Sequence, residues 1–358
     1  MKKSMYLIFI LSVTLVLGCG SKDTSSSNDQ DTKSKGNVTI NENSAAGSVS
    51  DYYPFKENVR YVYAGEGMEY ASSNLYVDFI KDSKIQYRVV NGGTTSGQVF
   101  EIKNDELRML DSVEEFYYRD DLTAEQGQMV DILLKEPLAK GNSWLSASGK
   151  KRYIAGIDIE VEVPYGRFKT IEVVTENGDS KVYDYYAKGV GVVKRIFNFK
   201  NNKVTVSLEK ILKDVKVDQT VKFYYPEYNK DLIVYKKIKL SLKTNEQVKD
   251  YFQKYFKEKP AADASTVISK KTKINKLYLN REENKVYVDF SKELIKNMNL
   301  GSGPETMMLQ AITNTLGDYY NVDKVHITVE GKNYESGVVI VDEKHPLMVN
   351  IKNTVEIK

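Results

Sequence analysis

The chain has 358 residues, of which 41% are apolar and 28% are charged, with a formal net charge of +3. This length allows two domains of ordinary size, and the composition is that of folded globular proteins. A single cysteine excludes an intramolecular disulfide, two histidines leave no His-rich metal motif, and the near balance of charge argues against a nucleic-acid partner.

The N-terminal residues have the pattern of a secretory leader. Lys2 and Lys3 precede an apolar run, Tyr6 to Leu17, which is too short for a membrane-spanning helix of ~20 residues. The run ends in Val-Leu-Gly-Cys, which resembles a bacterial lipobox. This resemblance implies cleavage before Cys19 and acylation of its thiol, so palmitate or a similar chain would hold the protein to the membrane. We predict a signal peptide over residues 1–18, lipid attachment at Cys19, and a location on the extracytoplasmic face of the cell membrane.

Residues 19–50 are predicted to form a disordered tether behind the lipidated cysteine. They are rich in Ser, Asp, Asn, Thr and Lys and contain almost no large apolar side chains. Such a segment buries too little apolar surface to offset the entropy lost on ordering.

Residues 51–214 are predicted to form an antiparallel β-rich domain, built as a meander, a half-barrel or a sandwich. Helical character is expected only over Ala124–Leu134. The segments Gly141–Trp144, Val163–Val173 and Tyr183–Arg195 resemble a recurrent β-rich module of bacterial surface lipoproteins, which implies no particular activity. The expected strands are Asn58–Tyr63, Asn74–Ile80, Ile85–Val90, Gln98–Ile102, Lys151–Val163, Phe168–Thr175, Lys181–Ala187, Val190–Phe199 and Lys203–Leu208.

Residues 217–358 are predicted to form an α+β domain with two helices on one face of a mostly antiparallel sheet, and we assign the whole chain to the α+β class. Capping boxes are expected where Thr244 precedes Gln247 and where Ser302 precedes Glu305. Each is followed by apolar residues at helical spacing, which predicts two amphipathic helices.

The stretch from Lys285 to Lys332 also carries a family resemblance. It contains VYVDFS at 286–291, GSGPE at 301–305 and NTLGDYYNVDKVHITVEGK at 314–332. These segments resemble the C-terminal half of the GerMN domain of sporulation and spore-germination lipoproteins. The run VKFYYPEYNKDLIVYKKIKL, at 221–240, resembles the opening of the same domain. The resemblance implies a setting in sporulation or germination and carries no established catalytic or cofactor residue.

Catalysis is not expected from these residues. Asp289 and Glu305 are candidate acids, and Ser291 and Ser302 are candidate nucleophiles, but no histidine is placed to activate a serine. His326 falls on the outward side of an expected strand, where a structural role is the simplest interpretation. A glycosidase needs two carboxylates, and the sequence singles out no such pair. We therefore predict no enzyme, no catalytic residue, no metal and no cofactor.

The predicted function is a non-catalytic binding or scaffolding role at the membrane surface during sporulation or germination. We assign a partner surface to Ser302, Glu305, Asp318 and Asp323, for an envelope or sporulation protein. The alternative is a peptidoglycan-binding or cortex-remodelling module of the cell wall. A third possibility, a solute-binding lipoprotein, fits poorly with the strand-rich N-terminal half.

Overall fold

The computed structural model describes residues 45, 47–124, 127, 130–200, 202–261 and 263–357. The predicted signal peptide, Cys19 and most of the predicted tether lie outside these residues. By packing, the chain divides into two compact units. The first runs up to residue 115 and resumes over 122–215, whereas the second comprises residues 116–121 and 216–358.

The first unit is one twelve-stranded antiparallel sheet, with strand order β6-β5-β4-β3-β2-β1-β12-β11-β10-β9-β8-β7. Nearly every connection joins neighbouring strands, as short turns between alternating segments favour. The strands are β1 (Arg60–Glu66), β2 (Ser73–Lys81), β3 (Lys84–Asn91), β4 (Thr95–Lys103), β5 (Glu106–Val113), β6 (Asp131–Lys135), β7 (Ser143–Leu145), β8 (Lys151–Val163), β9 (Gly166–Asn177), β10 (Ser180–Ala187), β11 (Gly191–Phe199) and β12 (Asn202–Leu212).

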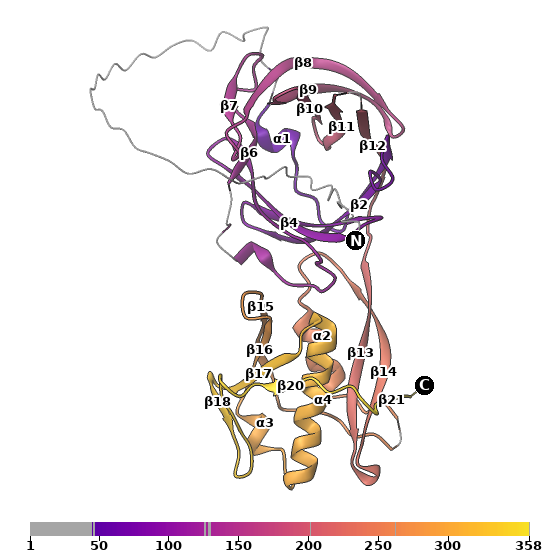
Figure 1. Ribbon diagram of the computed structural model, residues 1–358, viewed down its shortest axis with the longest axis vertical. Coiled ribbons are helices and arrows are strands. Elements are labelled where there is room, and N and C mark those ends of the chain that lie inside the picture. The colour runs from indigo at the N-terminus through magenta and orange to yellow at the C-terminus, as the bar shows by residue number, and fades with distance from the viewer. Residues whose placement is uncertain are drawn as a thin grey trace, which may run out of the picture. The chain divides into compact units, whose positions relative to one another are not determined.

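The sheet curls into a near-closed ring around the core of the first unit (Figure 1). Alternate residues of each strand point inward, so Tyr87, Ile154 and Leu208 are almost fully buried. The short helix α1 (Val49–Tyr52) lies inside the ring and adds Val49 to the same cluster (Figure 1). The last two residues of the predicted tether, 49 and 50, therefore belong to α1.

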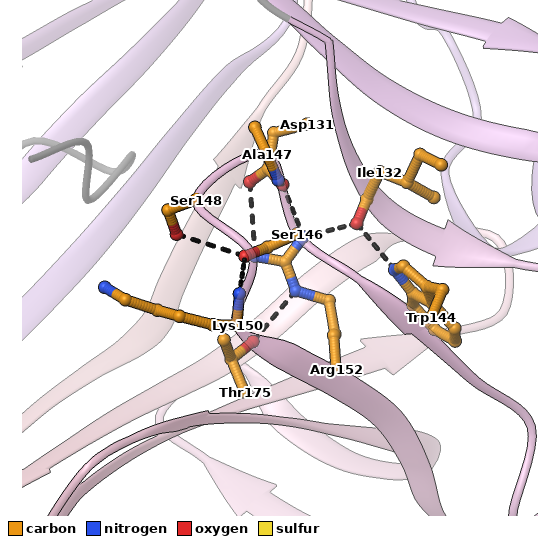
Figure 2. A network of polar contacts seen from close by, with 9 residues as sticks. All are labelled: Asp131, Ile132, Trp144, Ser146, Ala147, Ser148, Lys150, Arg152 and Thr175. Atoms are coloured by element: carbon orange, nitrogen blue, oxygen red, sulfur yellow. Dashed lines mark hydrogen bonds and ion pairs between the residues drawn. The ribbon is translucent and has the colours of Figure 1, made fainter. Parts of the chain in front are cut away.

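The two edge strands of the sheet, β6 and β7, are joined by side-chain contacts (Figure 2). Trp144 donates from Nε1 to the carbonyl oxygen of Ile132 at 2.8 Å. Arg152, on β8, forms an ion pair with Asp131 at 3.2 Å and donates from Nε to Thr175 Oγ1 at 2.8 Å. Edge strands that are covered in this way expose fewer unpaired backbone groups.

Two predictions for this part of the chain are wrong. Of the residues that the structure describes, 50% lie in strands and 14% in helices, so the fold is mostly β and the assignment to the α+β class does not hold. Within the expected helix Ala124–Leu134, the described residues form no α-helix: Ala124 ends a 3-10 turn, Leu122–Ala124, and residues 131–134 lie in strand β6. Leu134 is fully buried in the core and lies opposite Leu107 of β5, so the backbone pairing with β5 makes this segment a strand.

The second unit contains two sheets with helices between them (Figure 1). One sheet has the order β13-β14-β21, and the other has the order β15-β16-β17-β18-β19, with β20 also paired to β17. The strands are β13 (Val217–Glu227), β14 (Leu232–Leu242), β15 (Ile274–Asn280), β16 (Lys285–Phe290), β17 (Lys324–Val329), β18 (Lys332–Glu335), β19 (Ile340–Val341), β20 (Leu347–Met348) and β21 (Val355–Glu356). The helices are α2 (Val248–Phe256), α3 (Glu293–Lys296) and α4 (Ser302–Tyr320), with a 3-10 turn at Tyr228–Lys230.

This arrangement corrects the predicted single sheet with both helices on one face. Helix α4 contacts β13 and β14 of one sheet and β16, β17 and β20 of the other. From Met308 to Gly317 it is buried almost all round, as expected for a helix enclosed on two sides. Strands β16 and β17 run parallel, because α3 and α4 form the crossover between them.

A short segment that lies within the predicted range 51–214 belongs to the second unit. Residues 116–121 pack against the C-terminal end of α4, where the rings of Tyr118 and Tyr320 lie 5.3 Å apart. The Arg119 side chain is 1% exposed and donates to the carbonyl oxygens of Lys243, at 2.7 Å, and Glu246, at 3.0 Å. The second unit is therefore discontinuous in sequence.

Across the described residues, none of the helices combines the length and the apolar character needed to cross a membrane.

Candidate functional site

The residues predicted as a partner surface do not form one patch. Ser302 is exposed at the first turn of α4, whereas Asp318 lies sixteen residues later on the same helix. At a rise of about 1.5 Å per residue, the two positions are roughly 24 Å apart. Asp318 is partly buried and pairs with Lys222 Nζ at 3.1 Å, and Asp323 is exposed just beyond the helix end.

Glu305 is not a surface residue, which corrects its place in that prediction. Its side chain is 1% exposed and accepts a hydrogen bond from the Tyr334 hydroxyl at 2.8 Å. Both predicted capping boxes are also wrong, because the N-caps are Gly301 for α4 and Gln247, not Thr244, for α2, and neither makes a side-chain cap. Glu305 therefore supports the packing of β18 on α4.

A polar groove of about 470 Å³ lies on the sheet of β15 to β18, on the side away from α4. Val286, Phe290 and Ile327 are fully buried on the opposite face of the sheet, so the side chains that alternate with them face the groove. We call it the sheet groove. Its lining residues are Lys276, Tyr278, Tyr287, Val288, Asp289, His326, Thr328, Glu330, Gly331, Asn333 and Glu343.

The register of the strands places these residues in two rows. Tyr278 pairs with Tyr287, which pairs with His326, so three aromatic rings stand side by side across β15, β16 and β17. In the second row, Asp289 pairs with Lys276 on one side and with Thr328 on the other. The groove thus combines an aromatic row with a row of hydrogen-bonding groups.

Asp289 is held as a carboxylate by three donors. Its Oδ1 accepts from Thr328 Oγ1 and from the Gly331 backbone, both at 2.7 Å, and its Oδ2 accepts from Asn275 Nδ2 at 2.8 Å. Burial by itself would raise the pKa of Asp289, but these hydrogen bonds outweigh it and lower the pKa below the ordinary value. A carboxylate stabilised in this way is a poor proton donor.

His326 is buried at the centre of the aromatic row. Its side chain is 2% exposed, and its ring lies edge-on to Tyr287 at 5.3 Å. Burial first, and then the charge of Lys285, lower the pKa of His326, so the ring is neutral at pH 7. One ring nitrogen bonds the backbone of Asp342, whereas Nδ1 has no hydrogen-bond partner among the described residues.

The two tyrosines of the row are stacked and only partly covered. The rings of Tyr278 and Tyr287 are 5.3 Å apart and nearly parallel, at 4°. Tyr278 is 46% exposed, and the Tyr287 hydroxyl donates to Glu283 Oε2 at 2.7 Å. Lys285 pairs with the same carboxylate and lies 4.8 Å from the centre of the Tyr287 ring. These contacts fix the orientation of the aromatic row.

The candidate nucleophiles of the sequence, Ser291 and Ser302, do not line the groove. Ser291, a candidate nucleophile in the sequence, is buried and accepts from the Lys273 backbone at 3.0 Å. Within the described part of the chain, no three His, Cys, Asp or Glu side chains are placed to hold a metal ion. Strand alternation alone predicts that Asp289 and His326 face outward. That they line one groove depends on the parallel pairing of β16 with β17, which the α3–α4 crossover allows.

The chain is similar to several solved structures and to one family model. Among solved structures, the tandem GerMN domains of the sporulation protein GerM from Bacillus subtilis are 18% identical, with a TM-score of 0.29, over 37% of this chain and 46% of that chain. The match therefore spans less than half of that structure. The first GerMN domain of the same protein is 15% identical, with a TM-score of 0.25, over 37% of this chain and 97% of that chain.

A Clostridium perfringens protein described as a candidate lipoprotein is 17% identical, with a TM-score of 0.24, over 38% of this chain and 95% of that chain. No curated protein sequence matches the chain. Residues 222–335 match the family model Germane, which is described as sporulation and spore germination. The second unit thus contains a Germane domain, the GerMN-like module that the motifs of residues 285–332 predicted.

Proposed function

We propose that this protein is anchored by an acylated Cys19 to the outer face of the cell membrane and serves as a non-catalytic binding protein in sporulation or spore germination. The observation that carries the proposal is the Germane match over residues 222–335, in a chain whose first nineteen residues have a leader and lipobox pattern. The family description indicates sporulation or germination as the process, and the leader pattern indicates the outer face of the membrane as the location.

The geometry of the sheet groove supports binding over catalysis. Asp289 already accepts three hydrogen bonds and has a lowered pKa, so it neither donates a proton nor has the freedom of a nucleophile. His326 is neutral but enclosed, and no serine of the groove lies beside it. Rigid, prearranged polar groups beside exposed aromatic rings are instead typical of recognition sites.

The test is genetic complementation in the spore-forming host. A strain that lacks the protein should sporulate or germinate less efficiently, and the full chain should restore it. A Cys19→Ala chain should leave the membrane fraction and fail to complement. Normal spore yield and normal germination in the deletion strain would overturn the role, and an unchanged membrane fraction for Cys19→Ala would overturn the anchor.

A second candidate function is a peptidoglycan-binding module of the wall or cortex, favoured by the stacked and exposed Tyr278 beside polar groups in an open groove. Sedimentation of the protein with purified wall or cortex tests it. Binding without release of muropeptides supports the wall-binding role, whereas release of muropeptides would show catalysis and overturn the non-catalytic proposal.

A further inference from the structure

We infer that the sheet groove of the second unit is a saccharide-binding site, whose ligand is an uncharged N-acetylated glycan. The inference rests on the proposed binding function and adds the chemical class of the ligand and the groups that hold it. The groove volume of about 470 Å³ lies within the range of about 300–1,000 Å³ that small-ligand sites occupy.

The tyrosine pair supplies the apolar part of such a site. The C–H faces of a pyranose ring pack on aromatic rings, and Tyr278 offers 46% of its surface while Tyr287 fixes it from behind by stacking. The pair costs little conformational entropy on binding, because both rings are already held in place. Thr328 and Asn333, which pair across β17 and β18, add hydroxyl and amide groups along the same groove.

His326 supplies a specific acceptor. His326 is only 2% exposed and lines the groove. Its Nδ1 has no hydrogen-bond partner among the described residues. With the ring neutral and the other nitrogen bonded to the Asp342 backbone, Nδ1 carries a lone pair. A buried acceptor without a partner costs about 1–3 kcal/mol. Nδ1 is itself closed off from solvent, so the ring must turn toward the groove on binding for a sugar hydroxyl or acetamido N–H to satisfy it.

The charges of the groove exclude an anionic ligand. Asp289, Glu330 and Glu343 outnumber Lys276, so phosphate-rich polymers and acidic lipid headgroups would be repelled. A cationic peptide is the rival class. It is disfavoured because Asp289 has three of its roughly four acceptor positions filled, and Glu330 accepts from the Lys292 backbone at 2.9 Å. The remaining carboxylate of the groove, Glu343, is exposed and is the main one open to a lysine side chain.

The experiment is calorimetric titration of the full acylated chain in detergent with the tetrasaccharide of β-1,4-linked N-acetylglucosamine. Tetralysine is titrated in parallel. Tyr278→Ala should weaken saccharide binding tenfold or more. The matched control is Tyr165→Ala in the first unit, since Tyr165 is 45% exposed and also stacks on a neighbour, Phe168. It should bind as the wild type does.

Nitrogen-15 spectra of the two histidines provide a second measurement that does not depend on a substitution. Saccharide should shift the imine resonance of His326 and leave His345, which is exposed and bonded to Asp342, unchanged. Absence of saccharide binding, equal loss in both tyrosine variants, or a His326 resonance that does not move at saturation would overturn the inference.

The parallel titration separates the two proposals. Binding of tetralysine alone would overturn the saccharide assignment and leave the binding function standing. Defective spores in a Tyr278→Ala strain, together with no measurable saccharide binding by the wild-type protein, would likewise overturn the saccharide assignment and leave the binding function standing. Normal spores in the deletion strain, by contrast, would overturn the proposed function while saccharide binding could still be measured.

Discussion

Gly317 on helix α4 and Val349 in the C-terminal segment lie so close that a Cβ atom at position 317 would overlap Val349 Cγ2 and lie 2.9 Å from the carbonyl oxygen of Val322. The same segment is held by Asn314, which is fully buried. Its Nδ2 donates to the Asn350 carbonyl at 2.7 Å, and its Oδ1 accepts from the Asn350 backbone at 2.8 Å. Residues beyond the Germane match are thus an integral part of the second unit.

Gly317→Ala should therefore lower the free energy of unfolding of the second unit, by about 1–3 kcal/mol, because the added methyl has no space. The measurement is thermal and denaturant unfolding of the full chain. The control is Gly303→Ala in the same helix, where a Cβ would meet no atom within 4 Å. It should be neutral or slightly stabilising, by up to about 1 kcal/mol. Equal behaviour of the two variants would contradict the close packing.

The buried Glu305–Tyr334 contact gives a second prediction. Tyr334→Phe removes the hydroxyl that donates to Glu305 and leaves a carboxylate with 1% exposure without this donor. The variant should lose about 1–3 kcal/mol of unfolding free energy. In a double-mutant cycle with Glu305→Gln, the two losses should not add, since both changes affect one hydrogen bond. Additive losses would show that the residues act independently.

The sequence predicts much of the first unit, because its strands alternate clearly and its turns are short. Nine expected strands lie within or close to the observed ones. Strands β5, β6 and β7 are not among the expected strands. The residues of β6, Asp131–Lys135, fit helical spacing equally well, and only the pairing with β5 makes them a strand. The packing of residues 116–121 with the second unit depends on contacts such as Arg119 with Lys243, which no local pattern indicates.

The site was less predictable than the fold. The motif around Ser302 and Glu305 predicts a helix cap, yet the partner of Glu305 is Tyr334, 29 residues away. Outward positions such as Asp289 and His326 followed from alternation. The residues that surround them do not follow from alternation, because the parallel pairing of β16 with β17 and the contact of Asp342 with His326 belong to the tertiary structure. The Germane resemblance identified the domain and said nothing of the groove.

The lowered pKa of Asp289 predicts a pH dependence of stability. Because the folded state binds the proton less tightly than the unfolded state, Asp289 stabilises the fold above its ordinary pKa, near 3.8, and this contribution is lost as the pH falls through the folded value. Asp289→Asn should thus destabilise the protein most near pH 7, and the difference from wild type should shrink below pH 4. Calorimetric unfolding at a series of pH values measures it.

Asn275→Ala provides the comparison, because it removes the donor to Asp289 Oδ2 and keeps the carboxylate. It should reduce the pH dependence without abolishing it. A difference between wild type and Asp289→Asn that stays constant from pH 7 to pH 3 would show that the carboxylate charge contributes nothing to folding.

The contact between the edge strands of the first unit gives the last prediction. Arg152 and Asp131 form a pair whose side chains are 10% and 12% exposed, and Arg152→Met leaves the Asp131 carboxylate without its charge partner (Figure 2). Breaking a buried pair from one side costs about 3–5 kcal/mol. Trp144 is the single tryptophan and belongs to the same contact, so its fluorescence reports the unfolding of the first unit.

The control is Arg167→Met, which breaks an ion pair with Glu162 whose side chains are 82% and 70% exposed. Water screens that pair, so the unfolding midpoint of the control should not move. The double variant Arg152→Met with Asp131→Asn should be more stable than Arg152→Met alone, because no uncompensated charge remains. If both arginine variants unfold at the wild-type denaturant concentration, backbone pairing alone holds the curled sheet, and the side-chain contacts between β6 and β7 contribute nothing to its stability.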